Sequence, residues 1–101
     1  MATVSVVYKP EADAEIEIAF RGYEQERPGL GVDFLDEIGR IEGHLRIHPA
    51  LYQRLEGDIR RAVMRRFPYG IFYVIDRDQV VIVACLHLRR APPSRADLLA
   101  R

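Results

Sequence analysis

Two adjacent segments in the second half of the chain are apolar at almost every position, and they constrain the fold more than any other feature. Residues 69–75 and 79–87 have the length and the β-branched and aromatic content of strands. The polar residues 76–78 between them predict a tight turn, so the two strands form an antiparallel hairpin. A strand with one face in water alternates apolar and polar side chains, whereas a strand covered on both faces need not. We therefore expect this hairpin in the centre of a sheet that is covered on both sides.

Two amphipathic helices are predicted before these strands. Pro10 suits the first turn of a helix over residues 10–27, and a Pro-Gly-Leu-Gly break at residues 28–31 separates it from a second helix over residues 32–47. The two helices should form an antiparallel hairpin. The buried side of the second helix is predicted to carry Phe34, Leu35, Ile38, Ile41 and Leu45. Its solvent side is predicted to carry Asp33, Asp36, Glu37, Arg40 and Glu42.

Further short strands are predicted at residues 3–8 and 59–64, which gives the order strand, helix, helix, strand, strand, strand. This order indicates an α+β fold (β-α-α-β-β-β) in which the two-helix hairpin packs on one face of a small, mostly antiparallel sheet. A chain of 101 residues has room for one such domain, spanning residues 1–101. Only the C-terminal tail remains for the other face, and Pro92 and Pro93 are expected to end regular structure. We therefore expect a second molecule to cover part of the sheet.

The composition excludes several classes of protein. Hydrophobic residues make up 49% of the chain and charged residues 30%, which is the balance of a globular domain. No apolar run approaches the roughly 20 residues that span a bilayer, and the N-terminus lacks the pattern of an export signal, so we expect a cytoplasmic protein. Cys85, the only cysteine, lies in an apolar strand and is expected in the core. The three histidines, His44, His48 and His87, are too scattered to predict a metal site, and we expect no cofactor.

The charge sums to zero but is divided unequally along the chain. Residues 1–53 carry ten acidic and five basic side chains, and residues 54–101 carry five acidic and ten basic ones, so an anionic partner should meet the second half. The arginines that flank or occupy the predicted strand at 59–64 are Arg60, Arg61, Arg65 and Arg66. In a regular strand Arg61 and Arg65 would share one face. Two interpretations stay open, namely solvated arginines on an exposed strand and a docking patch for phosphate or carboxylate groups.

A set of short motifs in a fixed order identifies a family. Residues 65–73 read Arg-Arg-Phe-Pro-Tyr-Gly-Ile-Phe-Tyr, and residues 87–90, which end the last strand, read His-Leu-Arg-Arg. The second helix begins near Gly31 and Phe34, and Pro49 follows it. Together with the order of elements, these motifs resemble the RelE/ParE toxin superfamily over almost the whole chain. The resemblance implies a cytoplasmic toxin of a bacterial type II toxin–antitoxin system that is neutralised, in a hetero-oligomer, by an antitoxin whose chain wraps around it.

The superfamily includes ribosome-dependent mRNA endonucleases and ParE-like inhibitors of DNA gyrase, so the fold alone does not decide the activity. RNA cleavage needs a proton acceptor, a proton donor and cations around the phosphate. Endonuclease members often place a tyrosine or histidine near the C-terminus, and this chain has neither after His87. The chain also has Arg90-Ala91-Pro92 where the family commonly has Arg-Asp-Pro. The resemblance therefore favours a ParE-like gyrase inhibitor that is not an enzyme.

Two alternatives to the gyrase inhibitor remain, and the residues predicted to bind a partner are the same for all three functions. One is an mRNA endonuclease in which Arg61 or Arg65 stabilises the phosphorane and His87 transfers protons, although a histidine at the end of an apolar strand is usually a packed residue. The other is a degenerate toxin that only binds its antitoxin. The residues predicted to contact the target or the antitoxin are Arg60, Arg61, Arg65, Arg66, Tyr69, Tyr73, His87, Arg89 and Arg90. We expect the antitoxin's C-terminal segment to fold on binding and to combine apolar anchors with acidic residues that face these arginines.

Overall fold

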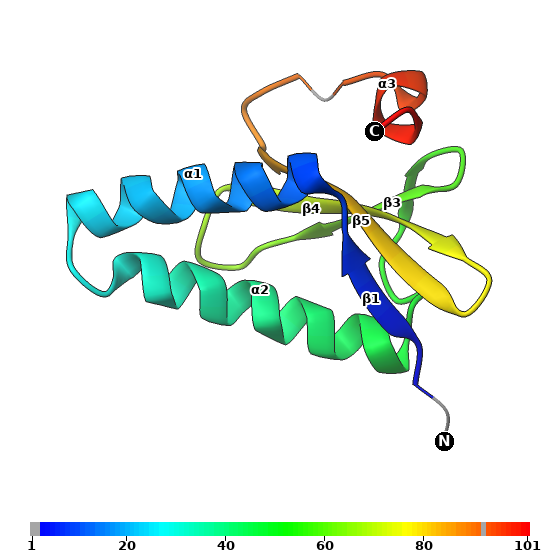
Figure 1. Ribbon diagram of the computed structural model, residues 1–101, viewed down its shortest axis with the longest axis horizontal. Coiled ribbons are helices and arrows are strands. Elements are labelled where there is room, and N and C mark those ends of the chain that lie inside the picture. Colours follow the sequence, from blue (N-terminus) through cyan, green and yellow to red (C-terminus); the bar gives the residue numbers. More distant parts are fainter. Residues whose placement is uncertain (1–2, 92) are drawn as a thin grey trace.

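The centre of the structure is a five-stranded sheet in the order β1-β5-β4-β3-β2 (Figure 1). The computed structural model describes residues 3–91 and 93–101. The elements are β1 (Ser5–Tyr8), α1 (Pro10–Glu26), α2 (Leu30–Ile47), β2 (Arg54–Glu56), β3 (Ile59–Val63), β4 (Tyr69–Asp76), β5 (Gln79–His87) and α3 (Arg95–Leu99). β1 runs parallel to β5, and the other neighbouring strands are antiparallel. The α+β fold that the sequence predicts is confirmed.

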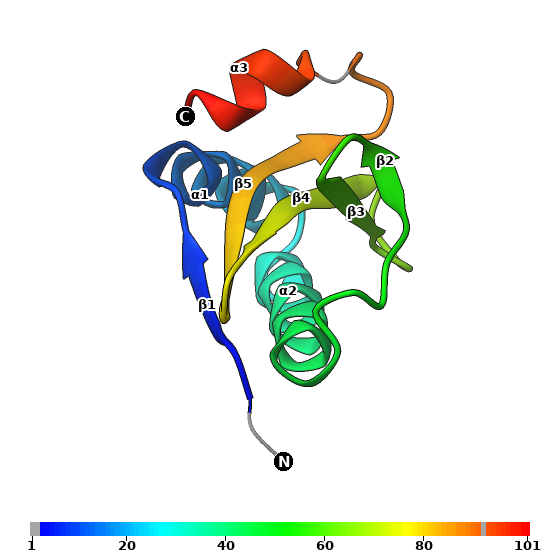
Figure 2. The same ribbon diagram turned by 90° about the vertical axis from the view of Figure 1, so that its right-hand side faces the viewer.

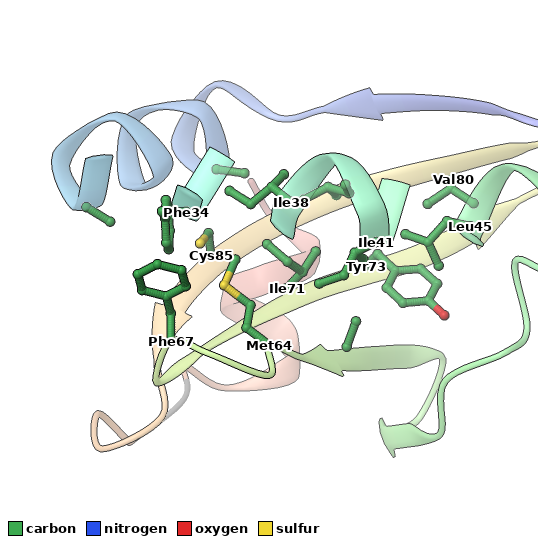
Figure 3. Packing of buried hydrophobic residues seen from close by; sticks show 14 residues of the cluster. Phe34, Ile38, Ile41, Leu45, Met64, Phe67, Ile71, Tyr73, Val80 and Cys85 are labelled. Carbon is green, nitrogen blue, oxygen red and sulfur yellow. The ribbon is translucent and has the colours of Figure 1, made fainter. Parts of the chain in front are cut away.

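The two apolar strands, β4 and β5, are covered on both faces, as their composition predicts. α1 and α2 pack on one face, which we call the helix face, and α3 lies over the opposite face, which we call the second face (Figure 2). The cluster on the helix face includes Phe34, Ile38, Ile41, Ile71 and Tyr73 (Figure 3). The smaller cluster on the second face consists of Ile59, Phe72, Val83, Ala84, Leu86 and Leu98.

The C-terminal tail contributes more structure than the sequence predicts. Pro92 lies outside the described residues, but regular structure resumes after it in α3, which corrects the expectation that the two prolines end it. The Ser94 hydroxyl accepts the Asp97 N–H and caps this helix. Leu98 is buried beneath the helix, with 2% of its surface exposed. The tail therefore covers part of the second face as an ordered helix.

A partly buried ion pair fixes the end of the tail. The Arg101 guanidinium donates to both carboxylate oxygens of Glu15 on α1, at 2.9 and 3.1 Å, and to the carbonyl oxygen of Val83, at 2.8 Å. Glu15 also accepts the backbone N–H of Cys85 at 3.1 Å. These bonds lie where β1 no longer accompanies β5, because β1 ends opposite Ile82. Glu15 and Arg101 therefore satisfy backbone groups of β5 that lie beyond the end of β1.

Two positions on α2 correct the predicted helix faces. Leu35 was expected in the core, but 41% of its surface is exposed, whereas Glu37 was expected in water and is 7% exposed. Glu37 follows Phe34 by three residues and precedes Ile41 by four, which puts it on the buried stripe. α2 also begins two residues earlier than predicted, at Leu30. Among the described residues, none of the helices has the length and apolar character that would carry it across a membrane.

The crossing between α1 and α2 depends on a glycine. A Cβ atom at Gly31 would lie 2.7 Å from the Phe20 ring and 2.8 Å from its carbonyl oxygen, so the helices can approach this closely only without a side chain there. The Glu24 carboxylate accepts the N–H groups of Gly29 and Gly31 at 2.9 and 2.8 Å. An acidic side chain thus satisfies free donors at the start of α2, where the helix dipole favours negative charge.

Neighbouring leucines in α3 offer a matched test of how the tail is held. Leu98→Ala should lower the free energy of unfolding by about 2 kcal/mol, at the low end for a buried leucine because a five-residue helix can detach on its own. Leu99 is 45% exposed, and Leu99→Ala should change the stability by less than about 0.5 kcal/mol. Urea denaturation of both variants measures the difference, and equal effects would contradict the docking of α3 through Leu98.

Candidate partner-binding surface

The residues predicted to bind a partner are divided between the two faces of the sheet. Arg61 lies opposite Phe72 in the ladder between β3 and β4, and Phe72 belongs to the second-face cluster. Tyr69 lies opposite His87, and the Tyr69 ring packs against Tyr23 and Phe34 on the helix face. Residues directly opposite each other in an antiparallel ladder project from the same face. Arg61 and His87 are therefore on opposite faces and cannot act together on one phosphate group.

Arg60 holds a neighbouring loop in place. Its guanidinium donates to the carbonyl oxygens of Tyr52 and Ala50, at 2.7 and 3.3 Å. These bonds fix the segment between α2 and β2 against β3. Arg60 was predicted to contact a partner, but its donors already serve the protein's own backbone. We therefore interpret it as a residue that positions the loop.

Arg65 and Arg66 lie in the loop after β3, which ends at Val63, so the alternation predicted for a strand does not reach them. The Glu37 carboxylate accepts the backbone N–H groups of both residues, the second at 3.1 Å. Both side chains point into solvent, and the Arg66 guanidinium lies 3.4 Å from the Asp33 carboxylate and 5.6 Å from the centre of the Phe67 ring. The loop is therefore anchored through its backbone and presents two cationic side chains.

The electrostatics of Glu37 follow from this geometry. Burial alone would raise the pKa of its carboxyl group. The hydrogen bonds from the backbone of Arg65 and Arg66, together with an ion pair to Arg40 at 3.0 Å, outweigh burial and hold the pKa below its ordinary value. Glu37 therefore stays ionised in the folded protein and keeps the loop in place.

A small hollow of about 100 Å³ lies at the free edge of β5, beside α1. It is lined by Glu15, Ile18, Ala19, Tyr69, Cys85, Leu86, His87 and Arg90. The Nδ1 atom of His87 accepts the backbone N–H of Arg89 at 3.1 Å, and its ring lies 5.2 Å from the Tyr69 ring. Cys85 is buried, as predicted, and burial raises the pKa of its thiol to about 12. The thiol is therefore protonated, and His87 is a packed residue, with one ring nitrogen already bonded to the backbone.

Tyr73 corrects the predicted set of binding residues. None of its surface is exposed, and its hydroxyl donates to the carbonyl oxygen of Pro49 at 2.8 Å. Figure 3 shows its ring within the helix-face cluster and its hydroxyl at the margin. Tyr73 supports the loop after α2 and cannot itself touch a partner.

A groove of about 400 Å³ lies where β2 and β3 form the far end of the sheet. We call it the β2–β3 groove; its lining is Leu51, Tyr52, Gln53, Arg54, Leu55, Arg61 and Val63. Of the predicted binding residues it contains only Arg61. The sequence did signal the others, because residues 51–55 combine leucines with an arginine outside any predicted element. Their place beside Arg61 depends on β2, which at three residues is too short for the sequence pattern to indicate.

Gly70 allows Arg61 to lie flat at this end of the sheet. A Cβ atom there would be 3.2 Å from the Arg61 Cγ and Cδ atoms and 3.3 Å from a Leu88 methyl group. Because Gly70 has no Cβ atom, the aliphatic part of Arg61 packs over the backbone of β4. Among the described residues, no acidic side chain forms an ion pair with Arg54 or Arg61. Two unneutralised guanidinium groups therefore border an apolar groove.

Known proteins provide an independent comparison. Residues 6–92 match the family described as the ParE toxin of the type II toxin–antitoxin system, parDE. Several solved structures share the fold, among them the following two. The chromosomal ParDE system from P. aeruginosa matches with a TM-score of 0.73 and 13% identity, over 84% of this chain and 96% of that one. The toxin–antitoxin complex RelBE2 from Mycobacterium tuberculosis matches with a TM-score of 0.57 and 20% identity, over 91% of this chain and 97% of that one. No curated protein sequence is significantly similar.

Replacing Glu37 tests the anchor of the cationic loop. Glu37→Gln should lower the free energy of unfolding by about 2 kcal/mol at neutral pH, because charge-assisted bonds to two backbone donors are weakened. The folded-state pKa lies below the ordinary value of 4.5. The contribution is therefore present above that pH and is lost as the pH falls through the folded-state pKa.

Urea denaturation from about pH 3 to about pH 7 checks this direction, because the free energies of unfolding of the wild type and Glu37→Gln should become equal in acid. The exposed neighbour Asp36 provides the control, since Asp36→Asn should have little effect. If Glu37→Gln lowers the free energy of unfolding by the same amount at every pH, the Glu37 charge does not hold the loop.

Proposed function

The chain belongs to the ParE toxin family of type II toxin–antitoxin systems, and we propose that it arrests growth in the cytoplasm by inhibiting DNA gyrase until a cognate antitoxin protein binds it. The match of residues 6–92 to that family carries the proposal. It extends from β1 to the segment that joins β5 to α3, and so includes both helices and the whole sheet. The antitoxin is part of the proposal because the two structures compared above are described as toxin–antitoxin systems.

The positions of the candidate catalytic residues favour an inhibitor over an endonuclease. A proton-transferring group and a phosphorane-stabilising cation must reach the same phosphate. Arg61 lies on the second face, His87 lies on the helix face, and the backbone N–H of Arg89 occupies one ring nitrogen of His87. Arg65 is fixed to α2 through its backbone. Among the described residues, we find no group of side chains arranged for RNA cleavage.

A supercoiling assay tests this function. Purified toxin added to gyrase and relaxed plasmid should inhibit supercoiling in a dose-dependent manner, and adding the protein encoded by the adjacent open reading frame should restore activity. Relaxation of the same plasmid by a type I topoisomerase is the control and should not change. Absence of inhibition over a wide concentration range, with ribosome-dependent mRNA cleavage that His87→Ala abolishes, would instead assign an endonuclease. Normal growth on expression of folded protein would assign a module that only binds its antitoxin.

A further inference from the structure

We propose that the β2–β3 groove is the docking site for an acidic, amphipathic segment of the antitoxin. This inference rests on the proposed function, because it assigns a surface to the partner that the function requires. It differs from the sequence-based expectation, in which the arginines of both faces form one patch.

The β2–β3 groove lies at the edge of the sheet, where β2 is the last strand. α3 covers the second face through Leu98, and its Arg95 side chain reaches the β2–β3 turn at Gly57 and Asp58. Apolar side chains there are open to water: Leu51 is 54% exposed, Leu55 42% and Val63 44%. A second hollow of about 450 Å³, lined by Ile47, His48, Pro49, Ala50 and Leu51, adjoins the groove through Leu51. A continuous apolar track of this kind is typical of a protein interface.

The charge around the groove identifies the chemistry of the partner. Arg54 and Arg61 line it together with leucine and valine side chains, and no acidic residue is among the lining residues. A segment that alternates apolar and acidic residues would bury its apolar groups in the track and form charge-assisted bonds to both guanidinium groups. A nucleic acid fits less well, because Tyr52 is the one aromatic ring of the lining that could stack on a base, whereas most of the exposed lining is leucine and valine.

The wall of the groove is already ordered in the free protein. Arg60 bonds to the backbone on both sides of Leu51, which fixes the loop that carries this leucine. Gly70 allows the Arg61 stem to lie against β4, so less side-chain freedom remains to be lost when a partner binds. Most of the conformational entropy lost on binding is therefore lost by the antitoxin segment, while the toxin surface changes little.

Other exposed apolar residues do not suit the same partner. Ile18 and Val32 are 72% and 51% exposed, but each adjoins an acidic residue of its own helix, Glu17 and Asp33 respectively. These carboxylates already pair with Arg21 and Arg66, at 2.7 and 3.4 Å, so an acidic segment would find no unpaired cation beside Ile18 or Val32 among these contacts. The helices therefore provide a control surface with similar apolar exposure and neutralised charge.

Two double variants test the assignment. Leu55→Asp/Arg61→Glu places negative charge in the groove and should weaken binding of the protein encoded by the adjacent open reading frame by about 100-fold. Val32→Asp/Arg77→Glu introduces the same two acidic side chains on α2 and in the β4–β5 turn. Its affinity for the same protein should stay within about threefold of the wild type. A milder variant, Arg54→Gln/Arg61→Gln, removes charge alone and should lower the association rate and its dependence on salt. Calorimetry and surface binding kinetics measure these effects, and thermal unfolding shows that each variant is folded.

The outcomes separate this inference from the proposed function. If the wild type binds the antitoxin and the groove variants bind equally tightly, the groove is not the docking site, although the proposed function stands. If the groove variants lose inhibition of supercoiling but keep antitoxin binding, the groove serves the target and our assignment is wrong. If the wild type and the α2 variant both fail to bind, the antitoxin part of the proposed function fails, and the groove assignment fails with it.

Discussion

The structure depends on covering both faces of β4 and β5. Their apolar residues alternate between the two faces, so exposure of either face would leave a large apolar surface in water. The α1–α2 hairpin covers one face, and the short tail covers part of the other through Leu98. The edge formed by β2 and β3 stays open and carries the apolar track, with two arginines that form no ion pair among the described residues. The same constraint thus explains both the core and the surface that we assign to a partner.

Two helix glutamates join the helical layer to the rest of the protein. Glu37 accepts two backbone N–H groups from outside the helices, and Glu15 accepts one. Glu15 reaches the free edge of β5 and holds Arg101 of the tail, while Glu37 holds the loop between β3 and β4. A carboxylate can be buried at little net cost when charge-assisted bonds replace its hydration. These contacts fix segments that have few apolar residues of their own.

Much of the fold could be predicted because long elements have strong periodic patterns. The two helices and the strands β3, β4 and β5 were predicted to within about two residues at each end. The short elements β2 and α3 were missed, because three to five residues carry too little pattern, and α3 forms by burying Leu98 against residues distant in the sequence. The site was predicted less well. Alternation within a strand is local, whereas the burial of Tyr73 and the clamp made by Arg60 depend on the loop after α2.

In this account the partner occupies the β2–β3 groove at the open edge of the sheet, while the helices serve to cover the core. Hydrogen–deuterium exchange of the toxin, alone and bound to the antitoxin, tests it most directly because the readout is local. We predict slower exchange on binding in residues 51–63, with little change at exposed amides near the start of α2. Protection confined to α1 and α2, with no change in residues 51–63, would contradict the account.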